Sequence, residues 1–221
     1  MEINKYIDHT LLKATATKNE IVKLCNEAKQ YHFYAVCVNG SYVELAKQEL
    51  QNTNVHIAAV IGFPLGAMTT EAKVFEAENC IEKGASEIDM VINVGKLLDG
   101  ENDYVENEIR LIKKAIGNNV LKVIFENCYL SEAQIKTASQ LAVNAGADFV
   151  KTSTGFGTGG ATFEDVQLMK NIVKENAQIK AAGGVRDKET AEKYIKMGVT
   201  RLGTSSGVSL VTKGVSDKNK Y

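Results

Sequence analysis

Two lysines stand where apolar residues would be expected. Lys151 follows a phenylalanine and a valine in ADFVKTSTGF, and Lys180 lies between isoleucine and alanine in QIKAAGGVR. One such lysine has a structural explanation, because it can reach water from the end of a strand. Two on adjacent parallel strands, each followed by glycine within four residues, would bring two ammonium groups into one cleft. Burial and mutual repulsion would lower the pKa of one amine, and a neutral lysine amine forms Schiff bases with carbonyls. The second lysine would keep its charge and serve in proton transfer.

Asp89 is a carboxylate inside another apolar run, EIDMVIN. An unpaired charge in a barrel strand would be costly, so a basic partner is expected. One interpretation is an ion pair with a lysine, which requires no catalysis. The other is a proton relay beside the reactive amine. The same contact would serve both, and the sequence leaves the two open.

Three glycine-rich turns lie close together in the second half of the chain, at residues 154–157, 183–186 and 203–207. They follow the last three predicted strands. Barrel enzymes often bind phosphate with the backbone N–H groups of the loops after strands seven and eight and with a short helix N-terminus. Glycine lets the backbone approach the phosphate, and the hydroxyls of Ser205 and Ser206 add donors. The turns therefore favour a phosphate site.

The segment GFGTGG, residues 155–160, also has the G-x-G-x-x-G spacing of a dinucleotide-binding turn. That site needs an acidic residue at the end of the next strand to hold the ribose. The next strand ends in Lys-Ala-Ala without an acid, which disfavours a nicotinamide site.

Short apolar runs alternate with amphipathic stretches along the whole chain. Eight of them are nearly apolar throughout, as parallel strands covered by helices should be. They are Tyr6–His9, Ala35–Val38, His56–Ile61, Glu87–Ile92, Leu121–Glu126, Asp148–Thr152, Gln178–Ala181 and Arg201–Gly203.

Helical patterns lie between these runs, and two begin with capping boxes. Thr17 and Glu20 open a predicted helix over Lys18–Tyr31, and Ser131 and Gln134 open another. Eight strands with intervening helices and no linker predict a single-domain (β/α)8 TIM barrel. An open, doubly wound sheet is the alternative, and the first strand decides between them.

Composition excludes several classes of protein. The 221 residues are 44% hydrophobic and 24% charged, with 26 Lys plus Arg against 27 Asp plus Glu. This near-neutral balance disfavours a nucleic-acid or membrane-surface partner. No apolar run reaches the length of a membrane helix, and the N-terminus does not resemble a signal peptide. The four scattered cysteines suggest reduced, mostly buried thiols, so we expect a cytoplasmic protein without a metal site.

The motifs KTSTGF and KAAGGVR, taken together, make the chain resemble the deoxyribose-phosphate aldolases, a family of class I aldolases. Further blocks extend the resemblance over nearly the whole sequence: IDHTLLK, VCVN, VIGFPLGA, EIDMVINVG, KVIFENCYL and GTSSGV. The family is a (β/α)8 barrel that needs no metal or organic cofactor. It reversibly cleaves 2-deoxy-D-ribose 5-phosphate into glyceraldehyde 3-phosphate and acetaldehyde, a step in deoxynucleoside catabolism.

The resemblance also implies roles for individual residues. Lys151 would form the Schiff base, Lys180 would perturb it and transfer protons, and Asp89 would donate and accept protons. Asp8 matches a polar residue at the rim of the active site. The phosphate ligands would be Gly155, Gly183, Gly184, Ser205 and Ser206.

The C-terminal segment is set apart from the rest. Residues 1–211 are expected to form the barrel domain. Residues 212–221 are polar, and this composition predicts a flexible tail. The tail ends in Tyr221, as it often does in the resembling family. We hypothesise that Tyr221 folds over the barrel mouth and relays a proton to the imine carbon.

Two other functions compete with this one. A transaldolase-like enzyme acting on another phosphosugar would use the same lysines, whereas a phosphate-binding barrel without catalysis would use neither. The expected partners are small phosphosugars and aldehydes. Self-association into a dimer or a tetramer is left open by the sequence.

Overall fold

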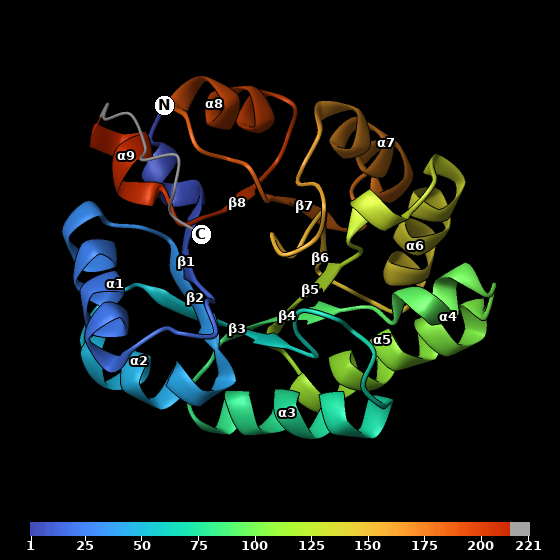
Figure 1. Cartoon of the computed structure of the whole chain (residues 1–221), viewed down its shortest axis with the longest axis horizontal. Helices are drawn as coiled ribbons and strands as arrows, with labels where there is room; N and C mark the ends of the chain where they lie inside the picture. The colour runs from blue at the N-terminus through green and yellow to red at the C-terminus, as the bar shows by residue number, and fades with distance from the viewer. Residues whose placement is uncertain (213–221) are drawn as a thin grey trace.

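The computed structural model describes residues 1–212, which form a closed barrel of eight parallel strands inside a ring of helices (Figure 1). Each strand pairs with the next in sequence, and β8 returns to pair with β1. The strands are β1 Ile7–Leu11, β2 Ala35–Asn39, β3 His56–Ile61, β4 Glu87–Val91, β5 Val120–Ile124, β6 Phe149–Lys151, β7 Gln178–Ala182 and β8 Arg201–Thr204. The predicted (β/α)8 barrel is confirmed, and the β1–β8 pairing excludes the open sheet.

At least one α-helix connects each strand to the next, and the helices cover the outside of the barrel. The α-helices are α1 Lys18–Tyr31, α2 Val43–Glu49, α3 Thr70–Glu82, α4 Val94–Leu98, α5 Asn102–Ile116, α6 Glu132–Asn144, α7 Phe163–Val173, α8 Lys188–Lys196 and α9 Gly207–Thr212. Three short 3-10 helices also occur: η1 Ile3–Tyr6, η2 Gly40–Tyr42 and η3 Asn127–Tyr129. Both predicted capping boxes are present at the starts of α1 and α6. None of the helices between residues 1 and 212 is long and apolar enough to cross a membrane.

The eight strands lie within two residues of their predicted bounds. The largest shifts are at β1 and β5. The 3-10 helix η1 occupies the predicted start of β1, which continues to Leu11, and β5 ends at Ile124, two residues before its predicted end. At the other end of the chain, α9 includes Thr212, the first residue of the predicted tail. Residues 213–221 lie outside the described part.

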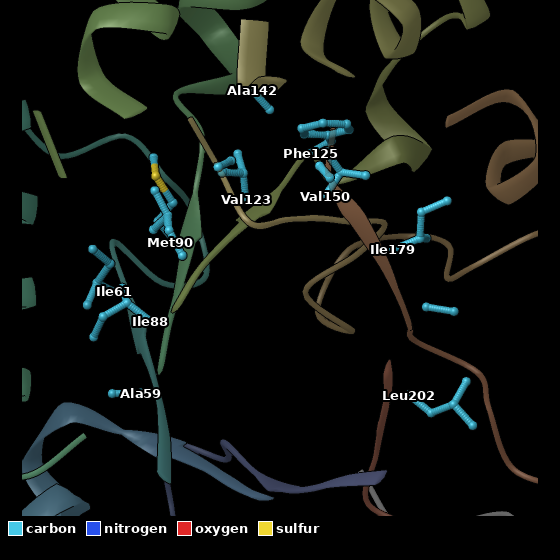
Figure 2. Close-up of a cluster of buried hydrophobic side chains, with 14 of the residues drawn as sticks. Ala59, Ile61, Ile88, Met90, Val123, Phe125, Ala142, Val150, Ile179 and Leu202 are labelled. Carbon is cyan, nitrogen blue, oxygen red and sulfur yellow. The ribbon is translucent and has the colours of Figure 1, made fainter. Parts of the chain in front are cut away.

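The hydrophobic core lies between the barrel and its helices (Figure 2). Successive side chains of a strand point to opposite faces, so alternate strand residues face the helices. Ile88, Val150, Ile179 and Leu202 are among these outward-facing core residues. Each is the immediate neighbour of a charged residue that points into the barrel.

Inside the barrel, charged side chains share the space with a small apolar cluster of Leu12, Cys37, Ala58 and Val60. The charges come from β1 and from β4 to β8, so some of the side chains are neighbours on paired strands and others meet across the interior. The barrel therefore separates an apolar shell from a largely polar lumen.

A buried ion pair outside the barrel fixes the end of β4. Lys73 of α3 donates to Glu108 of α5 at 2.9 Å and to the carbonyl oxygen of Val91 at 2.9 Å. Both side chains are fully buried. Since Val91 lies two residues after Asp89, this pair anchors the strand that carries the central carboxylate.

Candidate active site

A pocket opens at the carboxyl ends of the strands, where barrel enzymes have their active sites. Lys151 lies in it, together with the apolar side chains of Leu12 and Phe156. The ends of β7 and β8 contribute Gly183 and Ser205. The pocket thus combines a buried amine, an apolar wall and glycine-containing turns.

Lys151 is the last residue of β6 and is only 2% exposed. It lies opposite Lys180 in the β6–β7 register, as the adjacent-strand argument predicts. Its Nζ donates to Asp89 Oδ2 at 2.8 Å. Burial lowers the pKa of Lys151, and the positive charge of Lys180 lowers it further, against the opposing pull of Asp89. This direction agrees with the predicted fall in the pKa of one amine.

Lys180 differs from Lys151 in its carboxylate partners. Its Nζ donates to Asp89 Oδ2 at 2.7 Å and makes a second, short hydrogen bond to Asp8 Oδ2. Burial by itself would lower the pKa of Lys180, but the charges of Asp8 and Asp89 outweigh it and raise the pKa above its ordinary value. Lys180 therefore keeps its proton, as expected for the second lysine.

Asp89 is the centre of the site. Its Oδ2 accepts from Lys151 and Lys180, and its Oδ1 accepts from Lys122 at 2.7 Å. Burial would raise its pKa, but the three ammonium groups hold the pKa of Asp89 well below its usual range. The expected ion pair is present, and the carboxylate also touches both amines that the sequence assigned to chemistry.

Sequence reasoning missed Lys122 and Glu87. Lys122 lies in the middle of β5, and its Nζ is 2.6 Å from Glu87 Oε2 and 2.7 Å from Asp89 Oδ1. The signal was available, because Lys122 interrupts the apolar run LKVIF in the same way that Lys151 interrupts its own strand. Glu87 is the first residue of β4, and a polar residue at the start of a strand usually faces water.

The expectation that Asp8 stands at the rim of the site is wrong. Asp8 is fully buried in the barrel interior, where it accepts from Lys180 and from Arg201 Nη1 at 2.9 Å. Pairing of β1 with β8 places Asp8 opposite Gly203, beside the strand that carries Arg201. Arg201 is a further residue that the sequence did not indicate.

Glu126 holds the loop that follows Lys151. The carboxylate accepts from the backbone N–H of Thr154 at 3.1 Å and, through a short hydrogen bond, from its hydroxyl. Glu126 itself has a positive φ of 56°, which turns the chain sharply after β5. Thr154 lines the pocket, so this contact shapes the wall next to the amine.

The five predicted phosphate residues are only partly brought together. Gly183 and Ser205 line the pocket that holds Lys151, and Ser206 lines an adjoining hollow with Ser205. Gly155, Gly183 and Gly184 have φ values of 88°, 84° and 81°, a region that glycine adopts without strain.

Two remaining expectations concern the tail and metals. Tyr221 lies outside the described residues. Within residues 1–212, no group of three or more His, Cys, Asp or Glu side chains is arranged to hold a metal ion.

Comparisons with known proteins agree in pointing to one family. A family model described as DeoC/LacD family aldolase matches residues 3–214. The deoxyribose-phosphate aldolase of Treponema denticola is 55% identical over 214 residues, covering 96% of this chain and 99% of that protein. The deoxyribose-phosphate aldolase of a Geobacillus species is 58% identical over 218 residues, covering 98% of each.

Solved structures give the same result. A putative deoxyribose-phosphate aldolase from Coccidioides immitis superposes with a TM-score of 0.94 at 42% identity, covering 96% of this chain and 85% of that one. The deoxyribose phosphate aldolase from Aeropyrum pernix, described as tetrameric, superposes with a TM-score of 0.88 at 32% identity, covering 95% and 89%.

Proposed function

The chain belongs to the DeoC/LacD family of aldolases and is a carbon–carbon lyase, and from this premise we propose that it cleaves 2-deoxy-D-ribose 5-phosphate reversibly through a Schiff base on Lys151. One observation carries the proposal: a buried amine with a lowered pKa lies in the pocket, hydrogen-bonded to a carboxylate that also touches a charged lysine. The physiological role we propose is the catabolism of deoxynucleosides.

In the proposed cycle, the neutral amine of Lys151 adds to the C1 aldehyde of the open-chain sugar, and loss of water with uptake of one proton gives a protonated Schiff base. A base removes the C3 hydroxyl proton and the C2–C3 bond breaks. Glyceraldehyde 3-phosphate leaves, while the bonding electrons move into an enamine on Lys151. Protonation at C2 and addition of water release acetaldehyde and regenerate the amine.

Asp89 and Lys180 are the proposed proton carriers. Asp89 Oδ2 lies 2.8 Å from Lys151 Nζ and 2.7 Å from Lys180 Nζ, so one oxygen can receive a proton from either amine. The raised pKa of Lys180 keeps it charged, so this lysine carries a proton beside the carboxylate that contacts Lys151.

The substrate phosphate is proposed to lie on the turns after β6, β7 and β8, with Gly155, Gly183, Gly184, Ser205 and Ser206 as ligands. Backbone N–H groups in glycine turns and hydroxyl groups are suitable donors to a phosphate dianion. The positions of Gly183 and Ser205 in the pocket of Lys151 support this assignment.

We also propose that the protein works in the cytoplasm as a homo-oligomer, a dimer or a tetramer. The free cysteines of the described chain are compatible with a reducing compartment. Phe75 of α3, 71% exposed, lies near Leu111 of α5 in a surface hollow that a second copy could cover. A monomeric mass in light scattering would contradict self-association.

Reductive trapping tests the proposed chemistry. Incubation with acetaldehyde or deoxyribose 5-phosphate, followed by sodium borohydride, should add mass to the peptide that contains Lys151, because only an imine is reduced to a stable adduct. Activity should survive EDTA, since the proposed steps need no metal ion. An adduct on Lys180 instead of Lys151, or loss of activity on chelation, would contradict the assignment.

A further inference from the structure

The barrel interior holds more basic than acidic groups. Among the described residues, four bases and three carboxylates form one ion-paired cluster there: Lys122, Lys151, Lys180, Arg201, Asp8, Glu87 and Asp89. Each residue is at most 4% exposed. If every group were ionised, the cluster would carry one uncompensated positive charge away from water. Such a charge is costly, and release of a proton from one base removes the cost.

The bases do not share the carboxylates equally. Lys180 and Arg201 each pair with two carboxylates, and Lys122 contacts three. In the described part of the chain, Lys151 pairs with Asp89 alone, through an oxygen that also serves Lys180. A guanidinium does not lose its proton in proteins, so a lysine must be the neutral base. Of the three lysines, Lys151 has the least negative charge beside it to stabilise the ammonium form.

Arg201 and Glu87 lie at the opposite end of the barrel from the pocket, at the starts of β8 and β4. Arg201 donates through Nη1 and Nη2 to Glu87 at 2.7 and 3.3 Å, and its guanidinium lies 3.6 Å from the ring centroid of Tyr34. Glu87 also pairs with Lys122 at 2.6 Å. Neither residue contacts Lys151, so their influence on its amine is exerted through charge.

We propose that Glu87 and Arg201 are positioning residues that set, through the balance of charge in the barrel, how readily Lys151 takes its uncharged, nucleophilic form: Arg201 favours that form and Glu87 opposes it. The inference rests on the proposed function, because it concerns the amine that forms the Schiff base. Arg201 occupies both oxygens of Glu87 and one of Asp8, which leaves less negative charge to stabilise an ammonium at Lys151. The lowered pKa of Lys151 agrees with this arrangement.

The other groups around Lys151 do not alter the argument. β2 contributes the thiol of Cys37, whose pKa is raised by burial, so that it stays neutral. β3 contributes the apolar Ala58 and Val60. Glu126, at the mouth, is hydrogen-bonded to Thr154. Lys13, in the segment after β1, lines the same pocket as Lys151 and is present in every variant compared. The other charged neighbours in the described part of the chain are the cluster members on β1, β4, β5, β7 and β8.

Opposite charge changes at this remote pair should move the chemistry in opposite directions. Glu87→Gln removes a negative charge with little change of shape, whereas Arg201→Gln removes a positive one. At an effective dielectric constant of about 20, one unit charge roughly 10 Å from a titratable group shifts the pKa of that group by about one unit. The readout is the pH midpoint of acetaldehyde imine formation at Lys151, measured by quenching samples into borohydride and quantifying the labelled peptide.

We expect the midpoint to fall by about one pH unit in Glu87→Gln, to rise by about one in Arg201→Gln and to return near the wild-type value in the double variant. Arg201→Lys keeps the charge and should keep the midpoint. Shifts that are absent, or of the same sign in both single variants, would overturn the inference while leaving the proposed function intact. Wild-type protein without an adduct at Lys151 at any pH would instead contradict the proposed function.

Circular dichroism spectra and thermal unfolding identify variants that have lost the fold. Should Arg201→Gln not fold, Glu87→Gln decides the question, because a midpoint that stays or rises in that variant overturns the inference. A loss of packing would lower the yield of adduct, whereas a change of charge moves the midpoint.

Discussion

Lys151→Met is expected to reduce aldol cleavage by on the order of 10⁴-fold or more, because methionine fills the space of the lysine stem but has no amine to form the imine. The fold should be kept or gain stability. Removal of Lys151 leaves three basic groups and three carboxylates in the described interior, which is a balanced set. Turnover would be followed with a dehydrogenase coupled to one of the product aldehydes, and stability by thermal unfolding.

Lys136→Met provides a matched control, since Lys136 is an exposed residue of α6 outside the barrel interior. This variant should retain wild-type turnover. Cleavage by Lys151→Met at a rate near that of the control would show that another group forms the covalent intermediate, or that none forms.

Asp89→Asn is expected to slow turnover by on the order of 10²–10⁴, the usual contribution of a general acid–base group. Asparagine retains the shape of the side chain but cannot take up a proton from Lys151 or Lys180. Loss of the negative charge also disfavours the ammonium form of Lys151, so its pKa should fall further. Imine trapping at Lys151 should therefore persist and extend to lower pH.

This combination separates the two interpretations of Asp89. If it acts as a proton relay, turnover falls while the trapped imine remains. Near wild-type turnover in Asp89→Asn would instead reduce Asp89 to an ion-pair partner. Three lysines contact this carboxylate, so its replacement affects the packing of charges in the barrel. A thermal unfolding curve therefore distinguishes either result from loss of the fold.

The strands and the reactive amine were predictable because both follow local rules. Apolar runs with interspersed capping boxes place the strands to within two residues. Lys151 and Lys180 were recognised because each breaks an apolar run just before a glycine turn. These signals lie within a few residues of one another, so they do not depend on how the barrel closes.

The charge cluster depends on closure and could not be read from such signals. Asp8 and Lys180 are 172 positions apart, and they meet because β8 pairs with β1 and closes the ring. Arg201 and Glu87 each begin a strand, where charged residues usually face water. Only the closed barrel turns these strand starts into interior positions. Lys122 interrupts an apolar run as Lys151 does, but no glycine turn follows it closely.

The separation of an apolar shell from a charged lumen has a consequence for protein engineering. Stabilising substitutions belong among the residues of Figure 2, such as Ile88 or Ile179, where packing can be improved without touching a charge. Changes to the pH range of the chemistry belong at a charged position directly beside them, such as Glu87 next to Ile88. Because neighbouring positions face opposite compartments, heat tolerance and catalytic pH range should be adjustable in one strand by independent mutations.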